Sequence, residues 1–497
     1  MAPPHLIPTP TSMTAVPSSP FRLGAGAAIS GDPDAVAALQ AHLDALPDAP
    51  SAGPITLTVE AGGAAGSYRL EVDAASVTVA GADPAGLFAG IQTLSQLVQS
   101  GPDGWSIPAV RIDDEPRFAY RGVMLDVARH FHDVDTVKAY IDRASSLKFN
   151  VLHLHLSDDQ GWRLEILSRP DLTARAAASS VGGDAGGFYT QDDYREIVAY
   201  AAAHHMIVVP EIDVPGHTHA VSLAYPELSE QPVLSEHVHE VVALFGGDLP
   251  ENGTGYDGMA VGFSSLKIHE EATYDFLRDV FREVAGLTPG PYLHFGGDEA
   301  LGTGPADLAA FVARASALVA ETGKIPVAWH EAGAADRLAA GTIGQYWGFV
   351  SPTDGMDDKA RRFVAGGGRI ILSPADAIYL DMKFSASSPL GLTWANGPTS
   401  LRRAYEWGPA AVIDGIGDAE ILGVEAPLWT ETIRDLAAID AMAFPRIAAA
   451  AEAAWSAPFA STPERTWESF RTRVAGLEPL WTRLGIRFTP VQAGDPS

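Results

Sequence analysis

The sequence contains no cysteine, and basic residues are scarce in it. Without cysteine there can be no disulfides, no thiolate catalysis and no cysteine-based metal site. The 33 Lys and Arg stand against 62 Asp and Glu, which gives a net charge of −29 at pH 7. A chain this acidic repels nucleic-acid phosphates and anionic lipids. Neither nucleic acid nor a membrane is therefore expected as a partner.

Long hydrophobic runs are also missing. No stretch of about 18 apolar residues is present, so the sequence predicts no membrane span. The N-terminus, "MAPPHLIPTPTSMTAVPSSP", has neither the basic nor the apolar segment of a signal peptide. As it stands, the sequence predicts a cytoplasmic protein, or a secreted one if a leader has been removed. No pattern in it indicates an oligomeric state.

The 497 residues exceed what one hydrophobic core usually holds, so more than one domain is expected. Residues 1–20 are rich in Pro, Ser and Thr and are predicted to form an extended lead-in. Residues 21–115 are predicted to form a small α+β domain, because "ITLTVEA" and "YRLEVDAASVTVAG" alternate like half-buried strands. In the same part, "DPAGLFAGIQTLSQLVQS" carries apolar residues at helical spacing behind a capping Asp83 or Pro84.

From residue 116 onward, short apolar runs alternate with amphipathic helical stretches. The eight runs are "YRGVMLDVA", "FNVLHLHLS", "MIVVPEIDV", "PYLHFGG", "IPVAWHE", "TIGQYWG", "RIILSP" and "ILGVEAPLW". The helical stretches include "DVDTVKAYIDRASSLK", "DDYREIVAYAAAHH", "EATYDFLRDVFREVAG" and "DLAAFVARASALVAETG". Residues 116–497 are therefore predicted to form a (β/α)8 TIM barrel with C-terminal helices. A doubly wound open sheet is disfavoured, because no GxGxxG or P-loop turn is present.

One segment departs from this alternation. Residues 217–266 follow the third predicted strand and are too long for an ordinary strand-to-helix connection. Long connections in compact domains often carry function. This segment is predicted to be a functional loop.

The ends of the predicted strands carry carboxylates, aromatic rings, a histidine and an arginine. In chain order these residues are Arg129, Asp158, Asp159, Asp213, His217, Asp298, Glu299, Trp329, Trp347, Tyr379, Asp381, Trp429 and Glu431. Catalytic groups of a TIM barrel come from this end of the strands. Carboxylates and Arg hydrogen-bond sugar hydroxyls, while Trp and Tyr faces stack on the apolar face of a pyranose ring. The set predicts a carbohydrate pocket.

The stretch "PYLHFGGDEA" places two carboxylates, Asp298 and Glu299, next to each other. Two-carboxylate glycosidases hold their acids roughly 5–9.5 Å apart, on opposite sides of the scissile bond. Sequence neighbours can share a pocket, but they cannot flank a substrate in this way. Either the pair is ordinary loop acidity, or the chemistry takes only its acid from this pair and its nucleophile from elsewhere.

A series of motifs resembles glycoside hydrolase family 20, the β-N-acetylhexosaminidases. The motifs are "YRGVMLDVARHF", "FNVLHLHLSDDQGWRLEI", "VPEIDVPGHTHA", "VGFSSL", "LHFGGDEA", "YLDMK" and "LGVEAPLWTE", within residues 80–455. The resemblance implies an exo-acting, anomer-retaining enzyme that releases terminal β-linked GlcNAc, and GalNAc, without metal or organic cofactor. It also implies that the substrate's own acetamido oxygen attacks the anomeric carbon to form an oxazolinium ion, an exception to the two-carboxylate scheme.

The resemblance further implies a role for each matching residue. Glu299 would be the general acid and then the general base, and Asp298 would orient the acetamido group. Asp158 and His217 would support the proton cycling of Glu299, and Tyr379 would donate to the acetamido oxygen. The remaining residues would contact the sugars: Arg129, Asp381 and Glu431 through hydroxyls, Trp329, Trp347 and Trp429 as walls of the pocket, and Trp394 as a platform for the next sugar.

Some interpretations stay open. His153 and His155 form a His-x-His pair that could bind a catalytic metal in a barrel hydrolase, although a third ligand is not evident; barrel packing is preferred for both. A disaccharide-releasing enzyme of the same fold and a non-catalytic sugar-binding protein also fit the sequence. Asp126 is predicted to be structural, Asp159 either structural or functional, and His130 and His132 surface or loop residues. Trp162, Trp407, Trp455, Trp467 and Trp481 are predicted to be packing residues.

Overall fold

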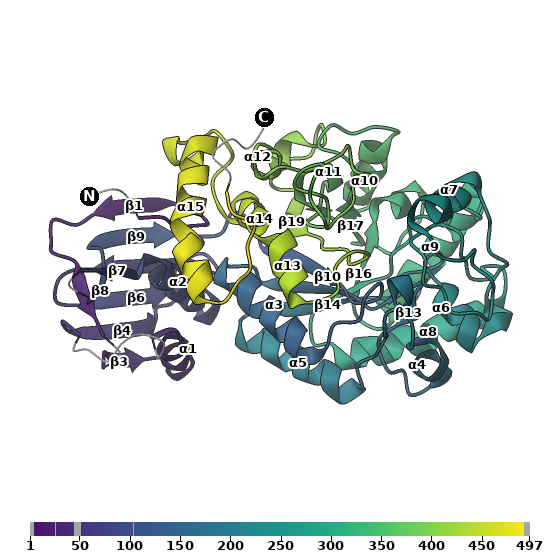
Figure 1. The fold of residues 1–497 in the computed structure, drawn as a ribbon, viewed down its shortest axis with the longest axis horizontal. Coiled ribbons are helices and arrows are strands. Elements are labelled where there is room, and N and C mark those ends of the chain that lie inside the picture. The colour runs from purple at the N-terminus through teal and green to yellow at the C-terminus, as the bar shows by residue number, and fades with distance from the viewer. Residues whose placement is uncertain (1–3, 25, 44–50, 103, 492–497) are drawn as a thin grey trace.

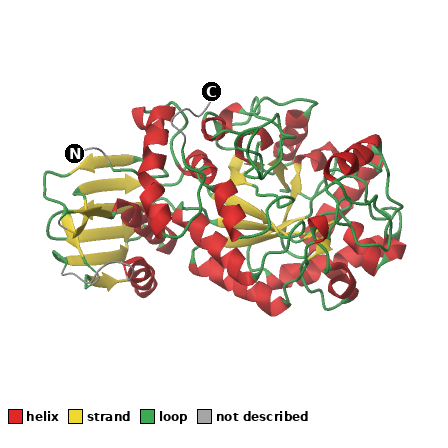
Figure 2. Cartoon of the chain, in the orientation of Figure 1, coloured by secondary structure: helices red, strands yellow, loops and turns green. Residues whose placement is uncertain are grey.

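The computed structural model describes residues 4–24, 26–43, 51–102 and 104–491. A β-sheet with its helices occupies the N-terminal end of the molecule, and a barrel of strands surrounded by helices forms the rest (Figures 1 and 2). Within the described residues, eight strands close the barrel, so the predicted TIM-barrel fold with a preceding α+β part is confirmed.

The N-terminal part is built on a mixed sheet with the strand order β1-β9-β5-β6-β4-β3. Its strands are β1 (Ser12–Ala15), β3 (Ala28–Gly31), β4 (Pro54–Val59), β5 (Tyr68–Val72), β6 (Val77–Gly81) and β9 (Val110–Asp114). A smaller sheet is formed by β2 (Phe21–Leu23), β7 (Gln99–Gly101) and β8 (Gly104–Ile107), and the helices are α1 (Pro33–Leu43) and α2 (Pro84–Leu97). Asp83 caps α2, as predicted. Part of the lead-in predicted over 1–20 is β1, which pairs with β9; residues 1–3 lie outside the described residues.

Each predicted apolar run in the barrel region contains one barrel strand. The strands are β10 (Tyr120–Asp126), β11 (Val151–His155), β14 (Ile207–Glu211), β15 (Tyr292–His294), β16 (Ile325–Trp329), β17 (Ile343–Tyr346), β18 (Ile370–Leu372) and β19 (Ile421–Ala426). Neighbouring strands pair in parallel, and β10 pairs with β19 to close the barrel. Parallel strands that are buried on both faces appear in a sequence as near-continuous apolar runs. The apolar runs therefore predicted the positions of these strands.

Several of the helices around the barrel begin at a residue whose side chain caps them. The larger helices are α3 (Val134–Ser146), α5 (Gln191–Ala203), α8 (Glu271–Leu287), α9 (Pro305–Glu321), α10 (Met356–Ala365), α13 (Leu436–Ala443), α14 (Arg446–Trp455) and α15 (Trp467–Arg483). Asp133 accepts from the Thr136 amide and caps α3, and Thr190 with Asp193 forms a capping box at α5. Smaller elements are the hairpin β12 (Ser157–Asp158) and β13 (Gly161–Trp162) and the helices α4 (Asp171–Ala176), α6 (His219–Ala224), α7 (Glu236–Phe245), α11 (Ala375–Ile378) and α12 (Leu401–Tyr405).

A buried ion pair joins the N-terminal sheet to the barrel. Lys148, just after α3, places its Nζ 2.9 Å from Asp114 Oδ2 at the end of β9. Trp455 donates its indole N–H to the other oxygen of Asp114 at 3.0 Å, and Tyr68 donates its hydroxyl to Oδ2 at 2.7 Å. Breaking one partner of such a buried pair would leave an unpaired charge, so this contact fixes how the two parts meet.

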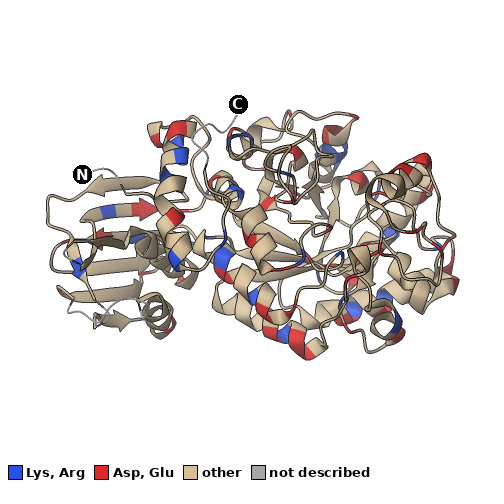
Figure 3. Cartoon of the chain, in the orientation of Figure 1, with Lys and Arg blue, Asp and Glu red and all other residues tan. Residues whose placement is uncertain are grey.

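The tail after residue 457 folds as predicted, with α15 lying between the sheet and the barrel helices (Figure 1). The five tryptophans predicted as packing residues are buried. Acidic residues occur in both parts of the molecule and are frequent on the helices around the barrel (Figure 3). Among the described residues, no helix combines the length and apolar character needed to cross a bilayer.

Candidate active site

A cavity of about 550 Å³ opens at the C-terminal ends of the barrel strands. Most residues predicted from the strand ends line it: Arg129, His217, Asp298, Glu299, Trp329, Trp347, Tyr379, Trp394, Trp429 and Glu431. Asp158 and Asp381 are buried and are not among its lining residues. The volume lies within the range of small-molecule sites, roughly 300–1,000 Å³.

The acid pair follows β15 through a tight backbone turn. Gly296 has a φ of 70°, and a Cβ at this position would lie 1.6 Å from Asp213 Oδ1, so only glycine fits here. Glu299 has a φ of 40°, which is uncommon for a residue with a side chain and typical of functional sites. The turn leaves Asp298 nearly buried, whereas the Glu299 side chain is 33% exposed. Both carboxylates therefore reach one cavity, with Glu299 nearer its opening.

A chain of polar contacts runs from the acid pair to the barrel wall. His217 Nε2 lies 3.3 Å from Glu299 Oε2 and 3.7 Å from Asp298 Oδ2. On its other side, His217 Nδ1 lies 3.2 Å from Asp158 Oδ1. Asp158 Oδ2 in turn accepts from Arg129 Nη1 at 2.7 Å and lies 2.7 Å from His155 Nε2. The imidazole thus connects the exposed carboxylate to a buried one.

Burial and neighbouring charges shift the pKa values of the residues in this series of polar contacts. Burial alone would lower the pKa of His217, but the charge of Asp158 outweighs it and raises the pKa well above its ordinary value. Burial, with the charge of Asp213, raises the pKa of Asp298 well above that of a free carboxyl. The pKa of Asp213 is raised in the same way. Both carboxyls therefore hold their protons more strongly than free carboxyls do.

Aromatic rings form the wall opposite the acid pair. Trp329 is buried and donates its indole N–H to Glu211 at 2.8 Å, which fixes the ring. Trp429 lies 6.0 Å from Trp329 between ring centroids and under the Arg129 guanidinium at 4.7 Å. Tyr379 lies 6.3 Å from Trp429, and burial raises its pKa well above the ordinary value, so its hydroxyl keeps its proton as a donor. Rings held by such contacts offer a rigid apolar surface to a sugar.

Several site residues were not singled out from the sequence, or were placed differently. Glu331 accepts from the Trp347 indole at 2.9 Å and so orients that ring. Its position in "IPVAWHE", two residues after Trp329 at a predicted strand end, could have identified it as a site residue. Asp213, counted among the strand ends, contacts the Gly297 amide at 3.3 Å beneath the acid pair. His130 and His132 were predicted as surface or loop residues; both lie in a loop, and both are buried rather than at the surface. The cause is a long-range contact, because residues around 189 and 430 cover this loop.

The predicted loop over 217–266 lines one side of the cavity and contains helices. Besides α6 it carries α7, whose residues His237, Glu240, Val241, Leu244 and Phe245 face the cavity together with Met259 and Val261. A period-3.6 apolar pattern in "EHVHEVVALF" was the available signal for the helix.

The His-x-His pair lies inside the barrel, below the cavity. His153 contacts Glu425 at 2.9 Å and Glu211 at 3.2 Å, and His155 contacts Glu211 at 2.5 Å. Nitrogen and oxygen atoms of His153, Glu211 and His294 lie within 4.8 Å of one another, close enough to hold a cation. Burial alone would lower the pKa of His153 and His155, but their carboxylate neighbours raise it to about 9. Both ring nitrogens of His153 and of His155 face carboxylates of the protein, so these contacts favour an ion-pair network.

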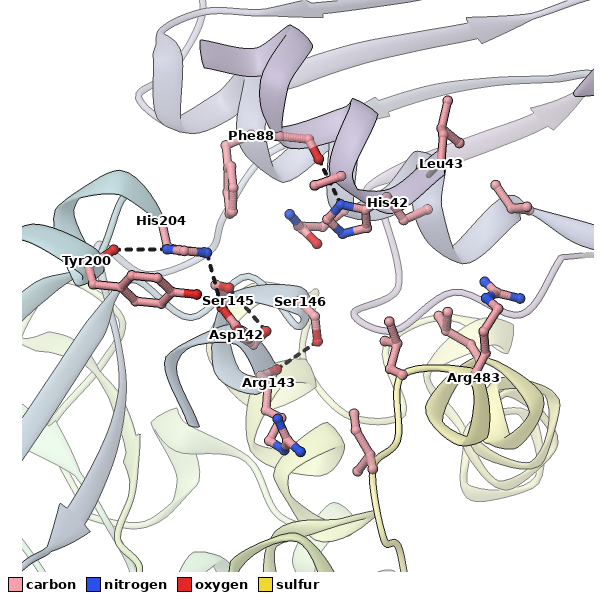
Figure 4. A pocket seen from close by; sticks show the side chains of 18 residues that line it. His42, Leu43, Phe88, Asp142, Arg143, Ser145, Ser146, Tyr200, His204 and Arg483 are labelled. Atoms are coloured by element: carbon pink, nitrogen blue, oxygen red, sulfur yellow. Dashed lines mark hydrogen bonds and ion pairs between the residues drawn. The ribbon is translucent and has the colours of Figure 1, made fainter. Parts of the chain in front are cut away.

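A second cavity, of about 410 Å³, lies between α1, α2, α3, α5 and α15, far along the chain from the acid pair (Figure 4). Its polar groups are largely used by one another: His204 lies 3.2 Å from Asp142, and Tyr200 donates to the same carboxylate at 2.8 Å. No carboxylate pair or aromatic wall like that of the first cavity is found among its described lining residues. The strand-end cavity is therefore the candidate active site.

The raised pKa of Glu331 gives a prediction about stability. Burial, with the charge of Asp298, raises the pKa of Glu331 to about 8. The folded protein then keeps a proton that the unfolded chain has lost, so the free energy of unfolding falls as the pH rises from about 4.5 to about 8. Glu331→Gln, which still accepts from Trp347, is expected to raise the free energy of unfolding at pH 8 by on the order of 2 kcal/mol.

Urea unfolding of both proteins at pH 4 and pH 8 checks this expectation. The difference between them should vanish at pH 4, where the glutamate is protonated in both states. A difference of the same size at both pH values would show that the substitution acts through packing and not through the proton.

Comparison with known proteins places these features in a family. The sequence matches "Glycosyl hydrolase family 20, catalytic domain" over residues 118–304 and 305–458, and "Glycosyl hydrolase family 20, domain 2" over residues 3–115. A β-N-acetylhexosaminidase of Cellulomonas fimi is 44% identical over 429 residues, covering 85% of this chain and 80% of that protein.

Solved structures agree. One described as "A Glycoside Hydrolase Family 20 beta-N-Acetylglucosaminidase" has a TM-score of 0.93 and 63% identity, covering 98% of this chain and 99% of that chain. The family 20 β-N-acetylhexosaminidase from Streptomyces coelicolor A3(2) has a TM-score of 0.88 and 41% identity, covering 98% of each chain. The resemblance seen in the motifs is confirmed: the chain belongs to glycosyl hydrolase family 20.

Proposed function

We propose that this glycoside hydrolase is an exo-acting, anomer-retaining β-N-acetylhexosaminidase that releases terminal β-linked GlcNAc and GalNAc. The observation that carries the proposal is the acid pair: Asp298 and Glu299 reach one cavity from one turn, and His217 contacts both. Such neighbours suit a reaction in which the protein supplies the proton donor and a cradle while the substrate supplies the nucleophile.

In the first step, the acetamido carbonyl oxygen of the terminal sugar attacks its own anomeric carbon. The bond from that carbon to the leaving oxygen breaks, and Glu299 gives its proton to the leaving oxygen. The product is an oxazolinium ion with positive charge shared by its N–H. Asp298 accepts from that N–H, and the positive charge of the ion favours the negative form of Asp298, which stabilises it in turn.

In the second step, Glu299 acts as the base. It takes a proton from water, whose oxygen attacks the anomeric carbon from the side the leaving group has vacated. The ring bond to the acetamido oxygen opens, and the sugar leaves with its original anomeric configuration. Two inversions thus give retention without a glycosyl ester on the protein.

The remaining residues position the substrate and the proton. Behind Glu299, His217 carries a positive charge and Asp158 a negative one. Together they help Glu299 to lose its proton in the first step and to accept one in the second. Arg129 uses Nη1 for Asp158 and places Nη2 3.4 Å from His217 Nδ1, while its Nε has no partner among the described residues. Its guanidinium lines the cavity, where it can donate to sugar hydroxyls. Glu431 lines the cavity and accepts from hydroxyls. Asp381 lies beside the Trp429 amide rather than at the cavity surface, so its predicted contact with a hydroxyl stays a prediction.

The aromatic residues divide between the two sugars. Trp329, Trp347 and Trp429 enclose the acetamido group and the ring, and Tyr379 donates its hydroxyl to the acetamido oxygen. Trp394 is 47% exposed at the rim, where it can carry the next sugar. For the chain as a whole we propose a lead-in over 1–20, an α+β domain over 21–115 and the catalytic barrel over 116–497. Largely separate buried clusters in the sheet and the barrel support the boundary between the second and the third of these parts.

Hydrolysis of chromogenic β-GlcNAc, β-GalNAc and β-glucoside, measured side by side with and without EDTA, tests the proposal. The two acetamido sugars are expected to be cleaved and the glucoside, which lacks the internal nucleophile, to be cleaved far more slowly. Activity should survive EDTA, because the proposed steps use side chains and substrate only. Equal cleavage of the glucoside, or loss of activity with the chelator, would contradict the mechanism.

The products from a chitin tetramer distinguish an exo-acting enzyme from a disaccharide-releasing one and from a binding protein. Single GlcNAc units should appear first. Disaccharides as first products would favour a disaccharide-releasing enzyme, and tight sugar binding without turnover would favour a binding protein.

A further inference from the structure

Among the described residues of helix α7, one side chain, Val238, is fully buried, and Val241 packs partly buried beside it. Val238 is fully buried against Tyr256, Ala260 and Phe263, and Ser235 caps the helix start by accepting from the Val238 amide at 3.3 Å. The last turn of the helix, which ends at Phe245, has little such packing. The helix is therefore anchored at its beginning while its end projects over the cavity.

The projecting end of α7 exposes large apolar side chains. Leu244 is 75% exposed and Phe245 is 50% exposed, yet both line the cavity that contains Glu299. Val241, Met259 and Val261 continue the same wall. Clustered exposed apolar residues at a site usually mark a place where a ligand or partner is bound.

This wall adjoins the part of the chain that carries Glu299. A Cβ placed on Gly262 would lie 3.1 Å from the carbonyl oxygen of Glu299 and 2.5 Å from Leu301, so the segment behind α7 packs directly against the chain that carries the acid. In the proposed function Glu299 protonates the leaving oxygen. The group attached to that oxygen therefore extends from the terminal sugar on the side of Glu299, where a sugar can rest on Trp394 and an apolar group can contact α7.

The chemistry of the wall indicates what kind of leaving group it binds. Aliphatic side chains gain free energy from covering alkyl and aryl surface, whereas a sugar also needs fixed hydrogen-bond partners. On α7 the polar residues facing the cavity are His237 and Glu240, and neither forms an ion pair with another described residue at the cavity. A negative Glu240 also disfavours anionic leaving groups.

We propose that the α7 wall, defined as Val241, Leu244, Phe245, Met259 and Val261, is a leaving-group subsite for alkyl or aryl groups. The enzyme then prefers terminal N-acetylhexosamines attached to an apolar aglycone over those attached to a small one. The proposal rests on the proposed function, because Glu299 sets the direction in which the leaving group extends.

Methyl, butyl and hexyl β-GlcNAc form a test series. Their leaving alcohols have similar acidity, so the bond-breaking step is matched and differences report on binding. Because each fully buried methylene gives up to about fourfold in affinity, kcat/KM is expected to rise at least tenfold from methyl to hexyl. In the double variant L244S/F245S the rise should shrink to about threefold or less. Both replaced residues are exposed, so folding should be unaffected.

Leu167→Ser is the matched control, since Leu167 is 65% exposed and is not a lining residue of the cavity. It should keep the full wild-type dependence on chain length. Equal kcat/KM for all three glycosides in the wild type, or an undiminished rise in L244S/F245S, would overturn the subsite. If none of the glycosides is cleaved, the proposed function itself fails, which is a different outcome from cleavage without chain-length dependence.

Discussion

Glu299→Gln is expected to lower kcat for chitobiose by about 10²–10⁴-fold, the range that general acid–base catalysis supplies. The glutamine fills the same space but can neither protonate the leaving sugar nor activate water. His217 stays 3.3 Å from the substituted side chain, so the geometry behind it should persist. Steady-state hydrolysis of chitobiose and of an activated dinitrophenyl β-GlcNAc measures the loss.

The two substrates separate the acid role from the base role. The dinitrophenyl group leaves without a proton, so the first step should be nearly normal in Glu299→Gln and the second step should limit turnover. Added azide needs no base and should restore turnover, with a β-glycosyl azide as product. Glu240→Gln makes the same chemical change at the cavity rim and should remain active. A Glu299→Gln enzyme that hydrolyses chitobiose at a near-normal rate would refute the role.

The barrel could be predicted because its signal is local. Strands buried on both faces read as apolar runs, and helices show their caps, as Asp133 does for α3. The candidate site then followed from a rule of topology, since the ends of parallel barrel strands meet at one face. Most of the predicted site residues do line one cavity.

What the sequence could not supply depends on contacts between distant segments. His130 and His132 are polar residues in a loop, and only the residues around 189 and 430 that cover them make them buried. Tyr379 and Asp381 are two residues apart, but the chain turns after α11, and only Tyr379 reaches the cavity. The exposed face of α7 has the same apolar spacing as the buried face of a packed helix. The sequence therefore could not predict that this face lies over the cavity.

Asp298→Asn is expected to lower kcat/KM for β-GlcNAc by about 10²–10³-fold, the range found when one electrostatic contact to a developing charge is removed. The asparagine can still accept from the acetamido N–H through its amide oxygen. It cannot carry the negative charge that stabilises the oxazolinium ion. The slow hydrolysis of β-glucoside should be nearly unchanged, so the preference for the acetamido sugar should collapse.

A thiazoline analogue of the cyclic intermediate gives a measurement that does not depend on turnover. An analogue that resembles the charged intermediate should bind the wild type much more tightly than GlcNAc does, because the site is complementary to that state. Asp298→Asn should lose most of this advantage while it binds GlcNAc nearly as before, which also shows that the variant is folded.

Fluorine atoms added to the acetamido group weaken its oxygen as a nucleophile, so wild-type rates should fall with each one. If rates stay constant along that series, or a glycosyl ester forms on a side chain, the nucleophile belongs to the protein and not to the sugar.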